Sequence, residues 1–139
     1  MKIIDCNAAF GHWPVQYFSH ESLLTLHEDY VACGIDEAWI SCMDAILAPE
    51  PDRSEKKFFA ELEAYPRFRP VKTVNPLLAN WKTSLYRSLD DTPLAAVKLF
   101  PSYQGYSLEL SPVHELCQTL VDLGLPLLVQ MRVNDERNQ

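Results

Sequence analysis

MKIIDCNAAFGHWP, which spans residues 1–14, is an apolar strand that ends in polar residues and breaks at Gly11. The segment contains no glycine-rich turn that could cradle a dinucleotide phosphate, because Gly11 stands alone and the whole chain has four glycines. This composition argues against a dinucleotide-binding sheet. The first strand therefore has to be interpreted together with the segments that follow it.

Strand-like and helix-like segments alternate along the chain. The apolar, strand-like runs cover residues 2–6, 37–42, 69–74, 95–100 and 125–133. The first helix-like segment covers residues 19–33 and ends before Gly34, and the second begins with a capping box at residues 52–55 and ends before Pro66. The third covers residues 80–88, and the fourth runs from the N-cap Ser111 and Pro112 to Gly124. Such alternation implies parallel strands joined by helical crossovers. Two architectures fit, an open doubly wound sheet or part of a (β/α)8 barrel.

Composition and charge narrow the class of protein. A chain of 139 residues with 47% hydrophobic residues fits one domain with a real core. The formal net charge of -7 argues against a nucleic-acid partner, which would need a basic face. The sequence shows neither a secretory signal pattern nor an apolar run near the roughly 18 residues that a membrane span requires. We therefore expect a cytoplasmic protein without a membrane partner.

The four cysteines show no spacing typical of metal or redox sites. Cys6, Cys33, Cys42 and Cys117 form no CxxC motif, and each lies among apolar neighbours. We therefore expect free, buried thiols that behave as small hydrophobic residues.

Four segments together resemble a known family. They are IDCNAAFGHWP at residues 4–14, YPRFRPVKTVNP at 65–76, AAVKLFPSYQGYSL at 95–108 and GLPLLVQMR at 124–132. They resemble strands one, three, four and five of the amidohydrolase-2, or aminocarboxymuconate-semialdehyde-decarboxylase-like, metal-dependent hydrolases. The resemblance implies an α/β fold, a partial (β/α)8 TIM barrel of about five parallel strands alternating with four helices. Residues 1–139 would form a single domain, the N-terminal half of a barrel of roughly 250 residues, and the chain is expected to be truncated.

The resemblance also shows where metal ligands are replaced. The two histidines of the family's first strand correspond to Asn7 and Ala9, and the histidine of its fifth strand corresponds to Gln130. A neutral amide is a poor zinc ligand compared with imidazole, thiolate or carboxylate. We therefore predict no metal ligands and no cofactor, and a divalent metal such as zinc is disfavoured.

Polar residues at the carboxyl ends of the expected strands form the candidate site. The candidate catalytic set is Asp5, Lys98 and Arg132, in which the two cations bind anionic oxygens and Asp5 orients Lys98. Asp44 and Asp135 are weaker candidates for a general base. The remaining candidates would contact substrate: Asn7, His12, Asp44, Asn75, Tyr103 and Gln130.

Several of these residues have simpler structural explanations that stay open. Lys98 could be a buried cation paired with Asp5 for structural reasons. His12 would then be a hydrogen-bonding loop residue, Tyr103 a packing residue, and Arg132 part of a solvated polar run.

The resemblance implies a hydrolase or decarboxylase that acts on a small organic acid or carbonyl compound. The alternative is a catalytically inactive homologue that binds a small ligand or serves as an assembly subunit. Half a barrel would leave its first and last strands unpaired, so we expect a homo-oligomer or completion by a missing C-terminal half.

Overall fold

The computed structural model describes residues 1–14 and 20–132, in which strands and helices alternate. The strands are β1 (Ile4–Phe10), β2 (Glu37–Cys42), β3 (Phe68–Thr73), β4 (Ala96–Leu99) and β5 (Leu127–Val129). The helices are α1 (Leu23–Ala32), α2 (Pro51–Leu62), α3 (Trp81–Asp91), α4 (Pro101–Gln104) and α5 (Ser111–Leu123), with a 3-10 turn η1 (Met43–Ala45) after β2.

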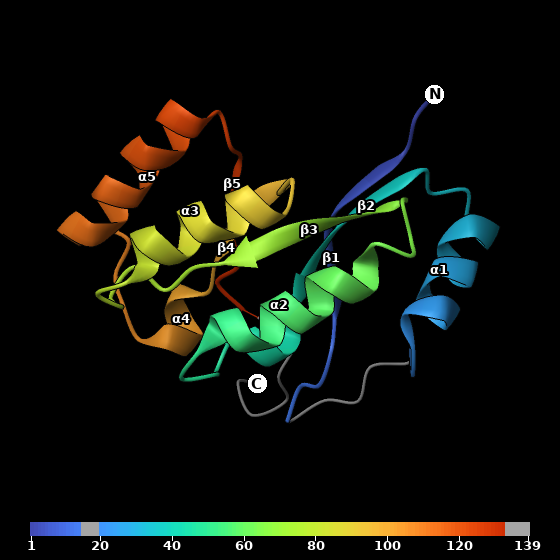
Figure 1. The fold of residues 1–139 in the computed structure, drawn as a ribbon, viewed down its shortest axis with the longest axis horizontal. Helices are drawn as coiled ribbons and strands as arrows, with labels where there is room; N and C mark the ends of the chain where they lie inside the picture. The colour runs from blue at the N-terminus through green and yellow to red at the C-terminus, as the bar shows by residue number, and fades with distance from the viewer. Residues whose placement is uncertain (15–19, 133–139) are drawn as a thin grey trace.

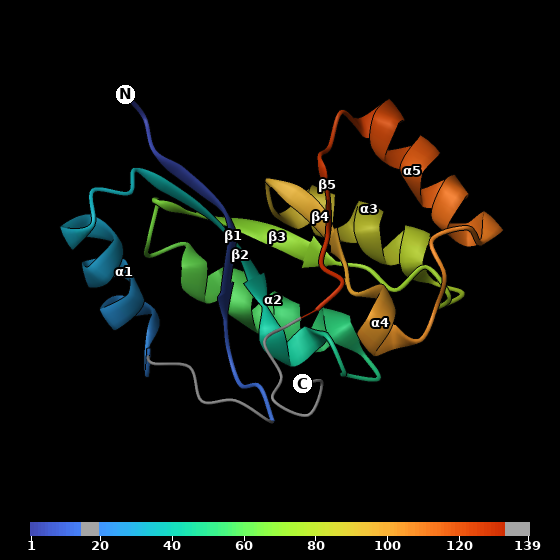
Figure 2. The same cartoon turned by 180° about the vertical axis from the view of Figure 1, so that it is seen from behind.

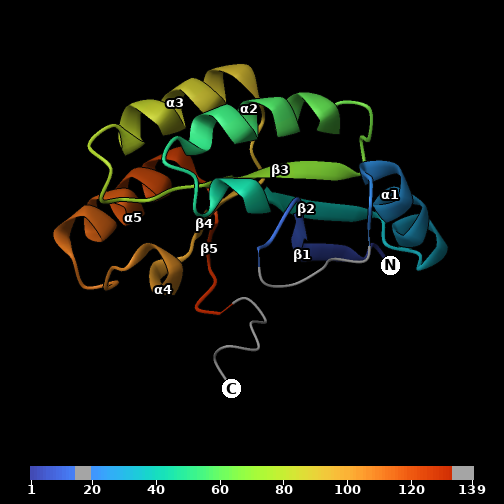
Figure 3. The ribbon, with the colours of Figure 1, turned by 90° about the horizontal axis from the view of Figure 1, so that it is seen from below.

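The five strands form one parallel sheet whose spatial order, β1-β2-β3-β4-β5, follows the chain. The sheet curls into a half-barrel (Figure 3). The described part of the sheet has no point at which the strand order reverses, so the doubly wound alternative does not apply. The predicted α/β class with about five parallel strands is confirmed.

The four longer helices cover the convex face of this sheet. In Figure 1, α2 and α3 lie side by side in front of the strands, and Figure 2 shows the opposite, concave face with β1 and β5 at its two edges. A single buried cluster joins these helices to the strands, and it includes Ile40, Phe58, Leu85, Leu99 and Leu116. Burial of this apolar face is the main force that holds the helices on the sheet.

The concave face carries two smaller apolar clusters. Val71 and Ala96 pack with Trp39 and Leu128 across the middle of the face. Residues that follow the carboxyl ends of β1, β2 and β4 form the second, which comprises Trp13, Met43, Ile46 and Phe100 with Ala9 and Tyr103 against it. Lys98 lies on the same face, with its Nζ 5.2 Å from the centre of the Phe100 ring.

The predicted strand boundaries agree best at β2. The strand expected at residues 37–42 coincides with β2, whereas the first strand runs over Ile4–Phe10 rather than residues 2–6. The last strand is limited to Leu127–Val129, shorter than the expected 125–133, and Val133 lies outside the described residues. Two short elements, η1 and α4, were not predicted.

Helix starts show where local signals compete with tertiary contacts. α1 begins with a capping box formed by Ser22 and Thr25. The capping box expected at residues 52–55 is wrong, because α2 begins at Pro51 without a side-chain cap, and both acidic side chains turn to Lys72 instead. Ser111 is likewise the first helical residue of α5 and not its N-cap.

The cysteine prediction is correct for the redox state and wrong for burial. All four thiols are free, but only Cys42 is buried, while Cys6, Cys33 and Cys117 are exposed. Cys6 lies on the edge strand β1, where the described chain places no further strand beside it, and the other two lie on helix surfaces. Among residues 1–14 and 20–132, no helix combines the length and apolar character needed to cross a membrane.

Candidate functional site

The concave face holds a buried lysine without a bonded carboxylate. Val97 and Leu99 pack into the core under the helices, so Lys98 between them points to the concave side. Its side chain is 1% exposed. The Lys98 Nζ donates to Asn7 Oδ1 at 2.7 Å and to Ser41 Oγ at 3.5 Å, and it lies 5.2 Å from the centre of the Phe100 ring. Within the described residues, both hydrogen-bond acceptors of this ammonium are neutral.

Asn7 reaches Lys98 because the first strand is irregular. The pairing of β1 with β2 shifts register between Asp5 and Ala8, as at a β-bulge. Asp5 therefore accepts a hydrogen bond from the Tyr30 hydroxyl of α1 at 2.7 Å, through Oδ2, and one from the Asn7 backbone N–H at 2.9 Å, through Oδ1. The bulge directs the Asp5 carboxylate toward α1 and the Asn7 carboxamide toward β4.

The predicted contact between Asp5 and Lys98 is not formed. The carboxylate of Asp5 is bonded to Tyr30 and to Asn7, and no ion pair joins it to Lys98. Regular alternation, which would have put Asp5 and Asn7 on one face, fails at the bulge. Asp5 still acts on Lys98 through space, since its negative charge favours the charged ammonium.

Burial sets the protonation of this site. Desolvation lowers the pKa of Lys98 to about 8, and the charges of Asp5 and Cys6 oppose this shift only in part. Burial likewise raises the pKa of Tyr30, and its hydrogen bond to the charged Asp5 adds to the shift. The Lys98 amine is therefore far easier to deprotonate than an ordinary lysine.

Arg132 and Gln130 lie beyond the end of β5. Gln130 continues the sheet hydrogen bonding through its backbone N–H, which donates to the Leu99 carbonyl at 2.9 Å. Its side-chain Nε2 donates to the Arg132 carbonyl at 3.2 Å. Arg132 is exposed, and no ion pair joins its guanidinium to another described residue. The structure thus does not bring Arg132 onto Asp5 or Lys98. Asp135 lies outside the described residues.

His12 and Asp44 meet at the carboxyl ends of β1 and β2. The Asp44 Oδ2 accepts a hydrogen bond from the His12 backbone N–H at 3.2 Å, and both side chains are exposed. Gly11 has φ of 125°, and a Cβ there would collide with the Asp44 carboxylate. Glycine is therefore required for the close approach of these two loops, and the His12 imidazole itself makes no part of this contact.

Tyr103 packs over the same end of the sheet. Its ring meets Trp13 edge to face, with centroids 5.2 Å apart and planes at 84°. Trp13 belongs to the buried apolar cluster that also contains Phe100. The packing role that the sequence left open for Tyr103 is thus present, and the cluster covers the concave face on the side of the strand ends.

Asn75 lies apart from Lys98. It follows β3, its Oδ1 accepts a hydrogen bond from the Leu77 N–H at 3.0 Å, and it lines a cleft of about 690 Å³ between α2 and α3. This cleft opens on the helix-covered side of the molecule. Among the sequence candidates that the structure describes, Asn7 is the one hydrogen-bonded to Lys98.

A second buried lysine, which the sequence analysis missed, lies beside this cleft. Lys72 of β3 is 1% exposed, and its Nζ donates to Glu55 Oε2 at 2.8 Å and to Asp52 Oδ1 at 3.0 Å. Glu55 is also 1% exposed, and its Oε1 accepts from the Thr73 N–H at 2.6 Å. Ser84 of α3 donates to Asp52 as well. A lysine inside an apolar strand, facing a helix with acids three residues apart, was the signal for this network.

Two carboxylates face one ammonium in this network. Burial alone would lower the pKa of Lys72, but the carboxylates of Glu55 and Asp52 outweigh it and raise the pKa above its usual value. The pKa of Asp52 is lowered in turn, since hydrogen bonds from Ser84 and Lys72 overcome its partial burial. Lys72 therefore fastens α2 to the sheet and remains charged.

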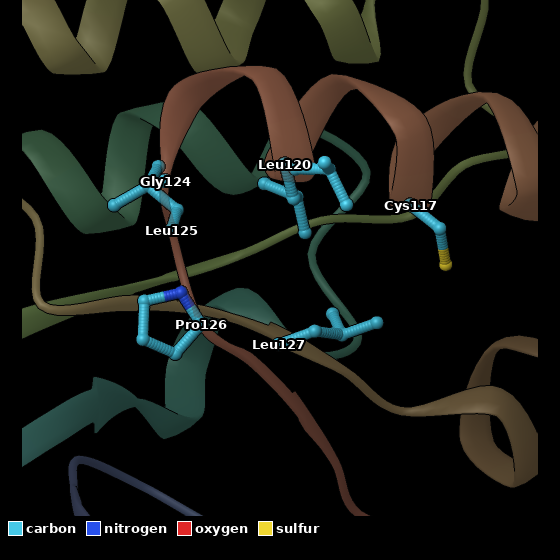
Figure 4. Close-up of a pocket in the computed structure, with 7 residues that line it drawn as sticks. Cys117, Leu120, Gly124, Leu125, Pro126 and Leu127 are labelled. Atoms are coloured by element: carbon cyan, nitrogen blue, oxygen red, sulfur yellow. The ribbon is translucent and has the colours of Figure 1, made fainter.

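An apolar groove lies at the β5 edge of the molecule (Figure 4). Its lining comes from the end of α5, the turn at Gly124 and the start of β5, and includes Cys117, Leu120 and Leu127. The groove has a volume of about 410 Å³, and Val121 beside it is 73% exposed. Such an uncovered apolar edge suits contact with further protein.

The described residues do not form a recognisable metal site. Within residues 1–14 and 20–132, no three His, Cys, Asp or Glu side chains gather closely enough to hold an ion. At Asn7, the position where the resemblance implies a ligand, the amide oxygen faces the ammonium of Lys98. A divalent cation bound to the same oxygen would be repelled by that charge, so this oxygen does not fit a metal.

Comparisons of the chain with models of protein families, with curated proteins and with solved structures find no match.

Proposed function

We propose that this chain forms the first half of a (β/α)8 barrel of the amidohydrolase kind and acts on a small organic acid or carbonyl compound at the concave face. Five parallel strands in chain order, with every longer helix on the convex side, are what the first half of such a barrel requires. The motifs that resemble strands one, three, four and five of that family support the same proposal.

The observation that carries the proposal is the environment of Lys98. Burying an ammonium among neutral groups lowers stability, and an apolar residue at the same strand position would not lose hydration in this way. Lys98 nevertheless lies 1% exposed on the concave face, next to the last residue of β4. In barrels of this type, active sites form at the carboxyl ends of the strands. A carboxylate or enolate oxygen would supply the negative counter-charge that the Lys98 ammonium lacks.

The other candidate residues take subsidiary roles in this proposal. Asn7 would orient the ammonium, and its exposed carboxamide marks the side from which a ligand enters. Arg132, exposed after β5, would reach a ligand only through a change in its side-chain position. We expect no metal at Asn7 or Gln130, and we expect the partner to be a small molecule rather than a nucleic acid.

A turnover screen tests the proposal. Purified protein would be incubated with a panel of lactones, amides and β-keto acids, and products followed by chromatography. Turnover of one class by the wild-type chain, lost in Lys98→Ala and retained in Lys82→Ala, would support it. Lys82 is exposed on α3 and serves as the matched control. Equal activity in Lys98→Ala would overturn the role of this residue.

A second candidate function is that of a catalytically inactive assembly subunit. The groove beside Leu120 and Leu127, together with edge strands β1 and β5, favours it, since such edges pair readily with other chains. Light scattering at micromolar concentration tests this candidate. A monomeric mass would count against assembly of like chains, and an oligomer without turnover on the panel would favour it over the enzyme.

A further inference from the structure

We propose that the Lys98 amine condenses with small aldehydes and keto acids to form an imine on the concave face, an inference that rests on the site proposed above and names its reactive group. Two independent observations carry it: the neutral contacts of Lys98 Nζ, and an unpartnered hydroxyl on the neighbouring strand.

The first observation is the choice of partners around the amine. An ammonium held by carboxylates stays charged, as Lys72 does with Glu55 and Asp52. Lys98 has only the amide oxygen of Asn7 and the hydroxyl of Ser41 as acceptors among the described residues. Neutral acceptors hold the free amine in place without favouring its charged form, which is the environment that activates a lysine as a nucleophile.

The second observation concerns Thr73. Thr73 on β3 is the register partner of Lys98, so both side chains point to the concave face. The Thr73 Oγ1 is buried and has no hydrogen-bond partner in the described part of the chain. A buried hydroxyl without a partner is uncommon and calls for an explanation. A carbonyl oxygen brought to Lys98 would give this hydroxyl a hydrogen bond.

The charges around the amine support the same conclusion. On the flanking strands, the partners of Lys98 are Thr73 and Leu128, neither of which titrates near neutral pH. The ionisable neighbours are Asp5 and Cys6, both on β1, and a negative charge on either favours the ammonium. Desolvation outweighs them and lowers the pKa of Lys98 to about 8. At pH 7.5 roughly a quarter of the molecules would therefore carry the free amine.

The reaction balances with water alone as co-reactant. The lone pair of Nζ adds to the carbonyl carbon, the carbonyl oxygen takes up a proton, and the resulting carbinolamine loses water to give the imine. With a β-keto acid, the protonated imine accepts the electron pair of the bond to the carboxylate, and CO₂ leaves. The enamine then takes a proton at carbon, and water hydrolyses the imine to release the ketone and restore the amine.

Reductive trapping tests the inference. Glyoxylate and cyanoborohydride would be added to the folded chain at pH 7.5, and the modified lysine located by peptide mass mapping. We expect Lys98 to be modified at least about tenfold faster than any other lysine, because the free-amine fraction of a lysine with an ordinary pKa is far smaller. The other lysines are Lys2, Lys56, Lys57, Lys72 and Lys82.

Three controls make the result decisive. Lys98→Arg should abolish the fast adduct and Lys82→Arg should keep it. In case Lys98→Arg does not fold, the wild-type chain in urea provides a second measurement, since unfolding should remove the preference for Lys98. Labelling confined to the exposed lysines, or equal rates at all six, would overturn the inference.

A non-carbonyl acid separates this inference from the proposed function. Glycolate cannot form an imine, but it can bind the ammonium through its carboxylate. Chemical-shift changes around Lys98 with glycolate, without trapping by glyoxylate, would overturn the imine and leave the proposed site intact. Trapping at Lys98 in a chain that turns over nothing on the substrate panel would support the imine and contradict the proposed function.

Discussion

Lys72 and Lys98 lie on neighbouring strands, are equally buried, and have opposite surroundings. Lys72 points to the helix-covered face, where Glu55 and Asp52 bind its ammonium at 2.8 and 3.0 Å. Lys98 points to the concave face, where Asn7 and Ser41 offer neutral oxygens. The pKa of the first lysine is raised and that of the second is lowered to about 8. Burial alone therefore does not set the pKa of a lysine, because the groups that accept its hydrogen bonds also contribute.

The difference separates a structural from a reactive lysine. At Lys72 the carboxylates offset the loss of hydration, and the network joins α2 and α3 to β3. At Lys98 no such compensation exists among the described residues, so the fold carries an ammonium that destabilises it at neutral pH. The same substitution made at both positions should consequently have opposite effects.

The largest effect is expected for Lys72→Met. This change leaves the Glu55 carboxylate buried without its cation, and we expect a loss of about 3–5 kcal/mol in the free energy of unfolding. Urea denaturation followed by circular dichroism measures it, with Lys56→Met, an exposed position on α2, as the control. A loss no greater than that of the control would show that Lys72 is not the support we describe.

The next effect, of opposite sign, is expected for Lys98→Met. Methionine fills a similar volume without a charge, and the exposed Asn7 can take its hydrogen bonds from water. A pKa near 8 rather than 10.5 corresponds to on the order of 3 kcal/mol, which sets the upper limit of the gain in unfolding free energy at pH 7. The same denaturation measurement applies. A loss comparable to that in Lys72→Met would remove the contrast between the two lysines.

The pH dependence of this gain sharpens the comparison. Because the folded pKa of Lys98 is lowered, the unfolded chain binds more protons between pH 8 and 10.5, and wild-type stability rises with pH in that window. Lys98→Met lacks this contribution, so its advantage over the wild type should shrink by about 2 kcal/mol between pH 7 and 9.5. Unfolding both proteins across this range isolates Lys98, since all other titrating groups are shared. An advantage that stays constant with pH would contradict the lowered pKa.

The smallest effect is expected for Asp5→Asn. The Asp5 charge favours the Lys98 ammonium from a distance, so its removal should lower the pKa of Lys98 further. The pKa of Tyr30 should fall at the same time, because its hydroxyl loses a charged acceptor. Nuclear magnetic resonance titration reports both groups. An unchanged pKa of Lys98 would mean that the Asp5 charge does not act on this lysine.

Local sequence patterns predict most of the strands and helices of this molecule. The strand at Glu37–Cys42 and the helix at Ser111–Leu123 follow from continuous apolar runs and from a Ser-Pro start before a terminal glycine. The alternation of such segments was enough to predict parallel pairing, but it left an open sheet and part of a barrel as equal alternatives. The short elements η1 and α4 were missed because turns of three or four residues leave little periodicity.

The site depends on contacts that no local pattern contains. Lys98 and Asn7 were both candidates, but their direct contact joins residues 91 positions apart and depends on a register shift in β1. The same shift separates Asp5 from Lys98, contrary to the alternation rule. Asp52 and Glu55 were interpreted as helix caps, whereas Lys72 of a distant strand takes both carboxylates. Long-range partners thus override local hydrogen-bonding preferences.

Titration of the lysine side chains by nuclear magnetic resonance tests the central contrast most directly, because it follows Lys72 and Lys98 in one folded sample. We predict that the Lys98 amine loses its proton near pH 8, while Lys72 stays charged beyond pH 10.5. Titration of both lysines above pH 10.5 would contradict the account, since it would mean that Lys98 also has a carboxylate partner.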